Sequence, residues 1–177
     1  MRVAGIILIM YKDAASISIL EQFRRRSDIP IVQIANFEEH KYYDSLMISN
    51  RYAAEMIVNH LYQLGHRDFG IITDIAATER EEAILTRLHE LGIVPKKANQ
   101  IVIENKRFED AGYAGAFRIL QNNRPTALIA TYDYIAIGIL KACCEMNIRV
   151  PEDLSVASID NISTSKFLNK ALTTVSM

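Results

Sequence analysis

The residues of this chain best placed to bind a small molecule follow short apolar runs. Tyr132 and Asp133 come directly after the run Ala127–Ala130, and a second run over residues 154–159 stops at Asp160. A carboxylate accepts hydrogen bonds from hydroxyl groups, while a neighbouring aromatic ring covers an apolar face of the same ligand. This combination predicts a site for a small hydroxylated molecule. A helix cap is an equally good interpretation of Asp133, because a helical pattern follows it.

The elements that must position these residues form a strand-helix-strand unit. Both apolar runs have the length of buried strands. Between them, apolar residues recur at helical spacing from Ile135 to Cys144, and Pro151 prevents the helix from continuing. Such a crossover makes the two strands parallel, and open parallel sheets bind ligands at the carboxyl ends of their strands. The pattern predicts an α/β fold with the candidate residues at one edge of a sheet.

A cation lies in the first turn of another expected helix, which we predict to open with the capping box Thr78–Glu81. Arg80 gains nothing from the helix dipole at that position, so another group should hold it. A surface ion pair with Glu79 or Glu82 is one explanation.

The alternation of strands and helices continues over the rest of the chain. Its 177 residues suit one compact domain or two small lobes. The further strands are expected at residues 3–10, 31–35, 45–49, 69–73 and 101–103. Residues 36–44 show no clean period and contain His40, Tyr42 and Tyr43. We expect this segment to cross between two lobes.

The composition argues against several classes of protein. Lys and Arg number 20 against 21 Asp and Glu, a net charge of −1, whereas a nucleic-acid-binding face needs a basic excess. No apolar run has the length of a membrane span, and no secretory signal opens the chain. Cys143 and Cys144 are adjacent in a helix and project apart, so we expect reduced thiols. We therefore expect a cytoplasmic protein without a membrane partner.

The sequence contains no pattern typical of an enzyme or a metal protein. His60 and His66 have no carboxylate or cysteine at metal-ligand spacing. Glycine-rich phosphate loops, nucleophile elbows and paired catalytic carboxylates are all absent from the sequence. The three arginines Arg24–Arg26 are best explained as solvated cations at a helix C-terminus. We expect a binding protein with no cofactor and no catalytic activity.

Six short motifs follow one another along the chain. They are LGHR at 64–67, PTALIA at 125–130, D-x-x-A-x-G at 133–138, VPEDLSV at 150–156, Asp160-Asn161 and ALTTV at 171–175. Together, and in this order, they resemble the sensor domain of the lactose/galactose repressor family of bacterial transcription regulators.

The resemblance implies a periplasmic-binding-protein-like fold of class I, with a doubly wound parallel sheet in each of two lobes. Residues 1–43 and 161–177 would form part of the N-terminal lobe, with a strand at 172–175 returning to it. Residues 44–160 would form the complete C-terminal lobe. The DNA-binding headpiece of the family has no counterpart in this sequence.

The resemblance also assigns roles to single residues. In the family, an arginine that matches Arg80 binds the effector, and an aromatic residue that matches Phe108 stacks on it. The implied effector site consists of Arg80, Asp160, Phe108, Tyr132 and Asp133. A hydrophobic staple or ordinary core packing is an equally good interpretation of Phe108. Tyr132 stands where the family usually has asparagine, which implies a bulkier pocket.

The implied function is effector sensing by a repressor-type transcription regulator. A small metabolite such as a sugar would bind between the lobes, and closure would reposition DNA-binding headpieces across a homodimer. Operator DNA would be contacted only through the headpiece. The alternative is a solute-binding protein of an uptake system with the same fold, which would require an export signal.

Overall fold

The computed structural model describes residues 3–9, 14–35 and 44–177. They divide into two compact units, unit 1 (Met1–Ser49) and unit 2 (Asn50–Met177). Most of the expected crossover segment, with His40, Tyr42 and Tyr43, lies outside the described residues, as does Met10 at the end of the first expected strand. Each unit has its own parallel sheet, which confirms the predicted α/β class.

Unit 1 is a three-stranded parallel sheet with one helix. Its elements are β1 (Ile6–Ile9), α1 (Ala14–Arg26), β2 (Ile31–Ala35) and β3 (Asp44–Met47), with the strand order β1-β2-β3. Residues 45–49 were expected to form a strand at the start of the C-terminal lobe. The strand instead covers 44–47 and pairs with β2, for example Ile34 with Leu46. The boundary between the compact units consequently falls after Ser49.

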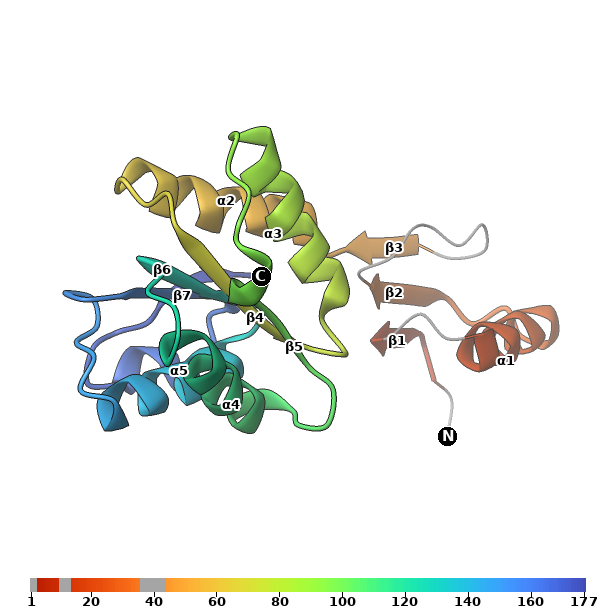
Figure 1. Ribbon diagram of the computed structural model, residues 1–177. Helices are drawn as coiled ribbons and strands as arrows, with labels where there is room; N and C mark the ends of the chain where they lie inside the picture. The colour runs from red at the N-terminus through yellow and green to blue at the C-terminus, as the bar shows by residue number, and fades with distance from the viewer. Residues whose placement is uncertain (1–2, 10–13, 36–43) are drawn as a thin grey trace. The chain divides into compact units, whose positions relative to one another are not determined.

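Unit 2 is a five-stranded parallel sheet with helices on both faces. Its helices are α2 (Asn50–Gln63), α3 (Thr78–Glu90), α4 (Phe108–Leu120) and α5 (Asp133–Glu145), with short 3-10 turns η1 (Lys97–Asn99) and η2 (Ser165–Phe167). Its strands are β4 (Phe69–Asp74), β5 (Gln100–Ile103), β6 (Ala127–Ala130), β7 (Ser155–Asp160) and β8 (Thr173–Ser176). The strand order is β5-β4-β6-β7-β8, a doubly wound arrangement. Figure 1 shows α2 and α3 on one face of the sheet and α4 and α5 on the other.

The central strands of unit 2 are apolar throughout because helices cover both faces of the sheet. Every residue of β4 and β6 is buried, as is typical of a parallel sheet between two helical layers. Ile71 and Ile129 pack with α2 and α3, whereas Ile72 and Leu128 pack with α4 and α5. Successive side chains of each strand therefore point to opposite faces of the sheet, and they form two core layers, one against α2 and α3 and one against α4 and α5.

Two glycines allow α4 and α5 to pack backbone against backbone. A Cβ atom on Gly138 would lie 2.0 Å from the carbonyl oxygen of Glu109, and one on Gly112 would lie 1.9 Å from the carbonyl oxygen of Ile135. No side chain fits at either position. This close approach accounts for the final glycine of the D-x-x-A-x-G motif.

The last strand corrects one expectation. Residues 172–175 were expected to return to the N-terminal lobe, but β8 pairs in parallel with β7, Ile159 opposite Val175. Val175 is 8% exposed and packs in the same core cluster as Ile159. Pairing with β7 buries this side chain and satisfies the outer edge of β7.

Helix ends show where local sequence signals hold and where they fail. Gly65 and Asn147 adopt positive φ angles of 95° and 55° at helix ends, as predicted. The predicted capping box at Thr78–Glu81 is wrong, because the N-cap of α3 is Ala77 and has no side-chain cap. The Asp74 carboxylate instead accepts a hydrogen bond from the Ala76 N–H at 2.9 Å, which fixes the turn before α3.

Candidate functional site

The candidate site lies at the carboxyl ends of β4, β6 and β7, within unit 2. The sheet order reverses between β4 and β6, since β5 follows on one side of β4 and β7 and β8 follow on the other side of β6. Such a switch point is where open α/β sheets bind ligands, because the connections on its two sides leave in opposite directions. Arg80 lies in the first turn of α3 after β4, Tyr132 follows β6, and Asp160 is the last residue of β7.

Arg80 bridges the ends of the strands. Its Nε donates to Oδ1 of Asn50 at 3.2 Å, and its Nη1 donates to the carbonyl oxygen of Thr131 at 2.8 Å. The same Nη1 lies 2.8 Å from Oδ1 of Asp160, with the two side chains 16% and 27% exposed. The ion pair that the structure gives Arg80 is thus with Asp160 rather than with Glu79 or Glu82. Arg80 and Asp160 lie together, as the sequence predicts.

Asp160 occupies a strained position at the end of β7. Its φ angle is 125°, and that of Asn161 is 52°, so two successive residues with side chains have positive φ. Such conformations cost on the order of 1–3 kcal/mol each and are concentrated at functional sites. Burial raises the pKa of the Asp160 carboxyl above its usual value; Arg80 opposes this shift and Asp133 adds to it. The ion pair therefore offsets only part of the desolvation of Asp160.

Three aromatic rings form a row that begins at this ion pair, with Tyr132 nearest, Phe108 next to it and Tyr134 beyond Phe108. The guanidinium carbon of Arg80 lies 5.1 Å from the centre of the Tyr132 ring, a distance typical of a cation–π contact. The Phe108 ring centre lies 6.3 Å from that of Tyr132 and 5.6 Å from that of Tyr134. Phe108 and Tyr134 are each 42% exposed, so Phe108 is not an ordinary core residue. Tyr134 was not predicted from the sequence, although it directly follows Asp133 in the same strand-to-helix connection region.

A second ion pair lies at the start of α4, next to Phe108, and was not predicted from the sequence. The Asp74 side chain is fully buried at the end of β4, and its Oδ2 lies 2.7 Å from Nε of Arg107. The guanidinium carbon of Arg107 lies 4.7 Å from the centre of the Phe108 ring. Phe108 itself has a φ angle of 54°. Asp74 could have been found by the argument that identified Asp160, since both are polar residues at the ends of apolar strands.

Asp133 has a different position from the one expected. Its side chain is fully buried, and its carboxylate accepts four hydrogen bonds from the protein. It does not cap the helix, because α5 has Tyr132 as its N-cap and no side-chain cap bond. Of the five residues expected in the site, Arg80, Asp160, Phe108 and Tyr132 lie together, and Asp133 lies beneath them.

The arrangement suits binding better than catalysis. It offers a partly exposed carboxylate, a guanidinium held by three acceptors and exposed ring faces. Among residues 3–9, 14–35 and 44–177, no three histidines, cysteines or acidic residues lie close enough to hold a metal ion. Within the same residues, no helix is both long and apolar enough to cross a bilayer.

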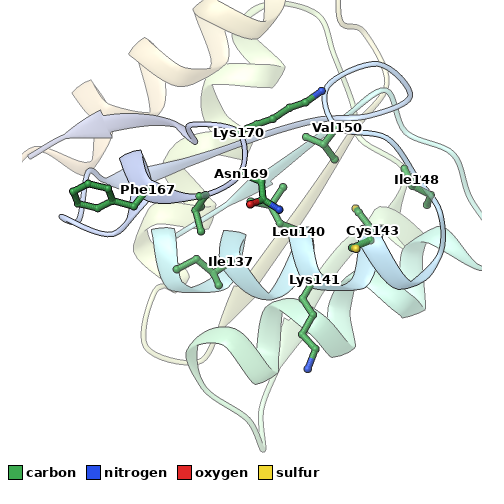
Figure 2. Close-up of a pocket in the computed structure, with 11 residues that line it drawn as sticks. Ile137, Leu140, Lys141, Cys143, Ile148, Val150, Phe167, Asn169 and Lys170 are labelled. Carbon is green, nitrogen blue, oxygen red and sulfur yellow. The ribbon is translucent and has the colours of Figure 1, made fainter.

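A separate groove of about 540 Å³ lies between α5 and the segment that follows β7. Figure 2 shows Ile137, Leu140 and Lys141 on the helical wall, with Phe167 and Asn169 contributed by the facing segment. Phe167 is 77% exposed, and Cys144 also lines the groove. We call this feature the α5 groove; most of its walls are apolar.

Comparison with known proteins defines the class to which this fold and site belong. Residues 58–177 match the family model of the periplasmic binding protein-like domain. The HTH-type transcriptional repressor PurR of Pectobacterium atrosepticum is 32% identical over 165 residues, which are 90% of this chain and 47% of the relative. The repressor of the same name from Salmonella newport is 34% identical over 167 residues. The chain spans about half the length of these relatives.

Solved structures with the same fold are also regulators of transcription. The Escherichia coli transcriptional repressor ascG matches with a TM-score of 0.83 and 21% identity over 99% of this chain and 64% of its own. A LacI family transcriptional regulator from Mycobacterium smegmatis matches with a TM-score of 0.75 and 26% identity over 98% of this chain and 64% of its own. The chain belongs to the periplasmic-binding-protein-like family, and it is similar to the lactose/galactose (LacI) family regulators within that family.

Proposed function

We propose that this chain is the effector-binding part of a repressor-type transcription regulator that acts in the cytoplasm without catalysing a reaction. The observation that carries the proposal is the Arg80–Asp160 ion pair against the Tyr132 ring, which in turn contacts the exposed ring of Phe108. The desolvation of both charges offsets much of the attraction in a partly buried ion pair, so stability alone is a weak explanation for its presence at the carboxyl edge. Its position at the start of a row of partly exposed aromatic rings is better explained by ligand binding.

The proposed effector is a small neutral metabolite with hydrogen-bonding groups and one apolar face. Arg80 and Asp160 offset each other's charge, so the pair leaves no unpaired charge for a charged ligand to neutralise. The exposed rings would cover the apolar face, while Asp160 and Arg80 would bond a donor and an acceptor on the ligand. A sugar meets this description, since its C–H groups form an apolar face and its hydroxyls both donate and accept.

Thermal-shift screening followed by calorimetry tests the proposal. A panel of neutral sugars and nucleobases would be screened against the chain and against longer forms of the protein that contain it. For a ligand that binds, Asp160→Ala should weaken affinity by about 1–3 kcal/mol, the penalty of leaving a buried polar group unpaired. Leu64→Ala, at a residue 63% exposed on the connection after α2, is the control and should leave affinity unchanged. Equal affinity of both variants would refute the assignment.

We also propose that the regulator is a homodimer and contacts operator DNA only through a DNA-binding headpiece. What supports dimerisation is the α5 groove, which has a concave apolar wall and a protruding Phe167 on one surface. In a two-fold interface the same patch meets itself, so a projection and a hollow side by side can be mutually complementary. Phe167→Ser should shift the monomer–dimer equilibrium toward monomer in analytical ultracentrifugation, whereas Val94→Ser, at a residue 77% exposed elsewhere, should not. An equal effect of both substitutions would exclude this surface.

A further inference from the structure

The buried carboxylate of Asp133 joins several elements that are distant in the sequence. Its Oδ1 accepts hydrogen bonds from the hydroxyls of Ser158 at 2.5 Å and Thr174 at 2.6 Å. Its Oδ2 accepts from the Ile162 N–H at 2.9 Å and from the Ser165 hydroxyl. The donors come from β7, β8, η2 and the loop between β7 and η2, and the acceptor stands at the start of α5. One side chain thus determines how five segments meet.

The first arm of this network leads to the candidate effector site. Asp160 is followed by Asn161, whose N–H donates to Oγ1 of Thr174 at 3.1 Å. Thr174 in turn donates to Asp133, and the next amide along the chain, Ile162 N–H, donates to Asp133 directly. These bonds hold the two successive positive-φ residues at the end of β7. The turn that presents Asp160 to Arg80 is therefore fixed from beneath by Asp133.

The second arm leads to the α5 groove. Ser165 is 1% exposed and opens η2, and its hydroxyl bonds Asp133. Phe167 and the following Leu168 line one side of the groove. Ile137, one turn along α5 from Asp133, lines the other side. The width of the groove is consequently tied to the same carboxylate.

We propose that Asp133 is a positioning residue that couples the effector site to the α5 groove. A ligand that moves Asp160 would pull on the Asn161–Ile162 turn, and the shared carboxylate would transmit the displacement to η2 and Phe167. The coupling is mechanical, because a saturated buried carboxylate cannot release one partner without leaving it unpaired. The biological meaning rests on the proposed function, whereas the coupling itself is testable without any ligand.

The test uses paired variants of the two arms. Thr174→Val keeps the shape of the side chain but removes the hydroxyl, and Thr174→Ser restores it. Ser165→Ala removes the bond to η2. Ile129→Val, a truncation in the core of β6, is the control for a general loss of stability. Asp133→Asn perturbs both arms, and if this variant fails to fold, the single-arm variants still decide the outcome.

Nuclear magnetic resonance and amide hydrogen exchange supply the readouts. In Thr174→Val, the amides of Asn161 and Ile162 should exchange roughly two- to tenfold faster, as expected for the loss of one hydrogen bond. The side-chain N–H signals of Arg80 should shift, and the ring signals of Phe167 should shift with them. Ser165→Ala should change the same two reporters, starting from the other arm. Thr174→Ser and Ile129→Val should change neither.

Separate responses of the two arms would overturn the proposal. If Thr174→Val moves the Arg80 signals but not those of Phe167, and Ser165→Ala does the reverse, Asp133 does not couple the two sites. Unchanged signals in both folded variants would equally refute it. No ligand enters these measurements, so their failure is distinct from failure of the proposed function, which is judged by metabolite binding alone.

Discussion

Replacing Arg80 by methionine should destabilise unit 2 more than replacing Asp160 by asparagine does, although both substitutions remove the same ion pair. Burial already raises the pKa of Asp160 despite the presence of Arg80. Without Arg80, a largely buried carboxylate loses its cation. Without the charge on Asp160, Arg80 still donates to Asn50 and Thr131. The two substitutions should therefore differ in cost, because Arg80 keeps two hydrogen-bond acceptors without the Asp160 charge, whereas Asp160 loses its cation without Arg80.

The expected magnitudes follow from the geometry. At 2.8 Å, Coulomb's law gives about 6 kcal/mol at an effective dielectric constant of about 20 and about 1.5 kcal/mol in water. Desolvation offsets much of this attraction, and the side chains of Arg80 and Asp160 remain 16% and 27% exposed. We expect a loss of about 2–3 kcal/mol for Arg80→Met, less than about 1 kcal/mol for Asp160→Asn, and a coupling energy of about 1–2 kcal/mol.

Urea unfolding of the two single variants and the double variant measures these quantities, with the resonances of β6 and β7 reporting on unit 2. The penalty of Arg80→Met should also depend on pH. Because the folded-state pKa of Asp160 is raised, the charge-dependent part of the penalty should be lost as the pH falls through that raised pKa and Asp160 becomes protonated. The part that comes from the lost bonds to Asn50 and Thr131 should remain. Equal losses from both single variants, or a penalty independent of pH, would refute the reasoning.

Three further predictions concern packing, ligand contact and thiol chemistry. Gly138→Ala should lower the free energy of unfolding by about 3 kcal/mol, because the new Cβ would meet a backbone oxygen at 2.0 Å. Gly65→Ala, where only the φ angle of 95° opposes the change, should cost about 1 kcal/mol in the same urea titration. For an identified effector, Phe108→Ala should weaken binding about tenfold in calorimetry, since aromatic contact contributes about 0.5–1.5 kcal/mol beyond burial; unchanged affinity would exclude stacking. Burial raises the pKa of Cys143 to about 11, so iodoacetamide at pH 8 should modify the exposed Cys144 and spare Cys143, as peptide mass spectrometry would show.

Much of unit 2 could be predicted from the sequence because its signals are local. The apolar run at Ala127–Ala130 and the helical spacing after it specify a strand and a helix, and a parallel crossover places Asp160 at the same edge as Tyr132. Gly65 and Asn147 mark helix ends by their tolerance of positive φ. These features depend on residues within a few positions of each other, so hydrophobic pattern and conformational propensity are enough to predict them.

The pairing of strands depended on the tertiary structure. Asp44–Met47 pairs with β2 and Thr173–Ser176 with β7, opposite to the expected assignment of each strand to a lobe. The sequence of a short strand does not specify which strand it pairs with, because any apolar sheet edge of suitable register can accept it. The burial of Val175 against Ile159, which the linear sequence does not reveal, determines the choice for β8.

The roles of the carboxylates were likewise decided by three-dimensional packing. Asp74, Asp133 and Asp160 all stand at strand ends or just after them, and the sequence alone cannot distinguish their surroundings. In the fold, Asp160 is partly exposed beside Arg80, Asp74 is buried against Arg107, and Asp133 is buried among hydroxyl and amide donors. The sequence determined that carboxylates gather at this edge of the sheet. The tertiary structure decided which of them can face a ligand, because burial and hydrogen-bond partners come from segments far apart along the chain.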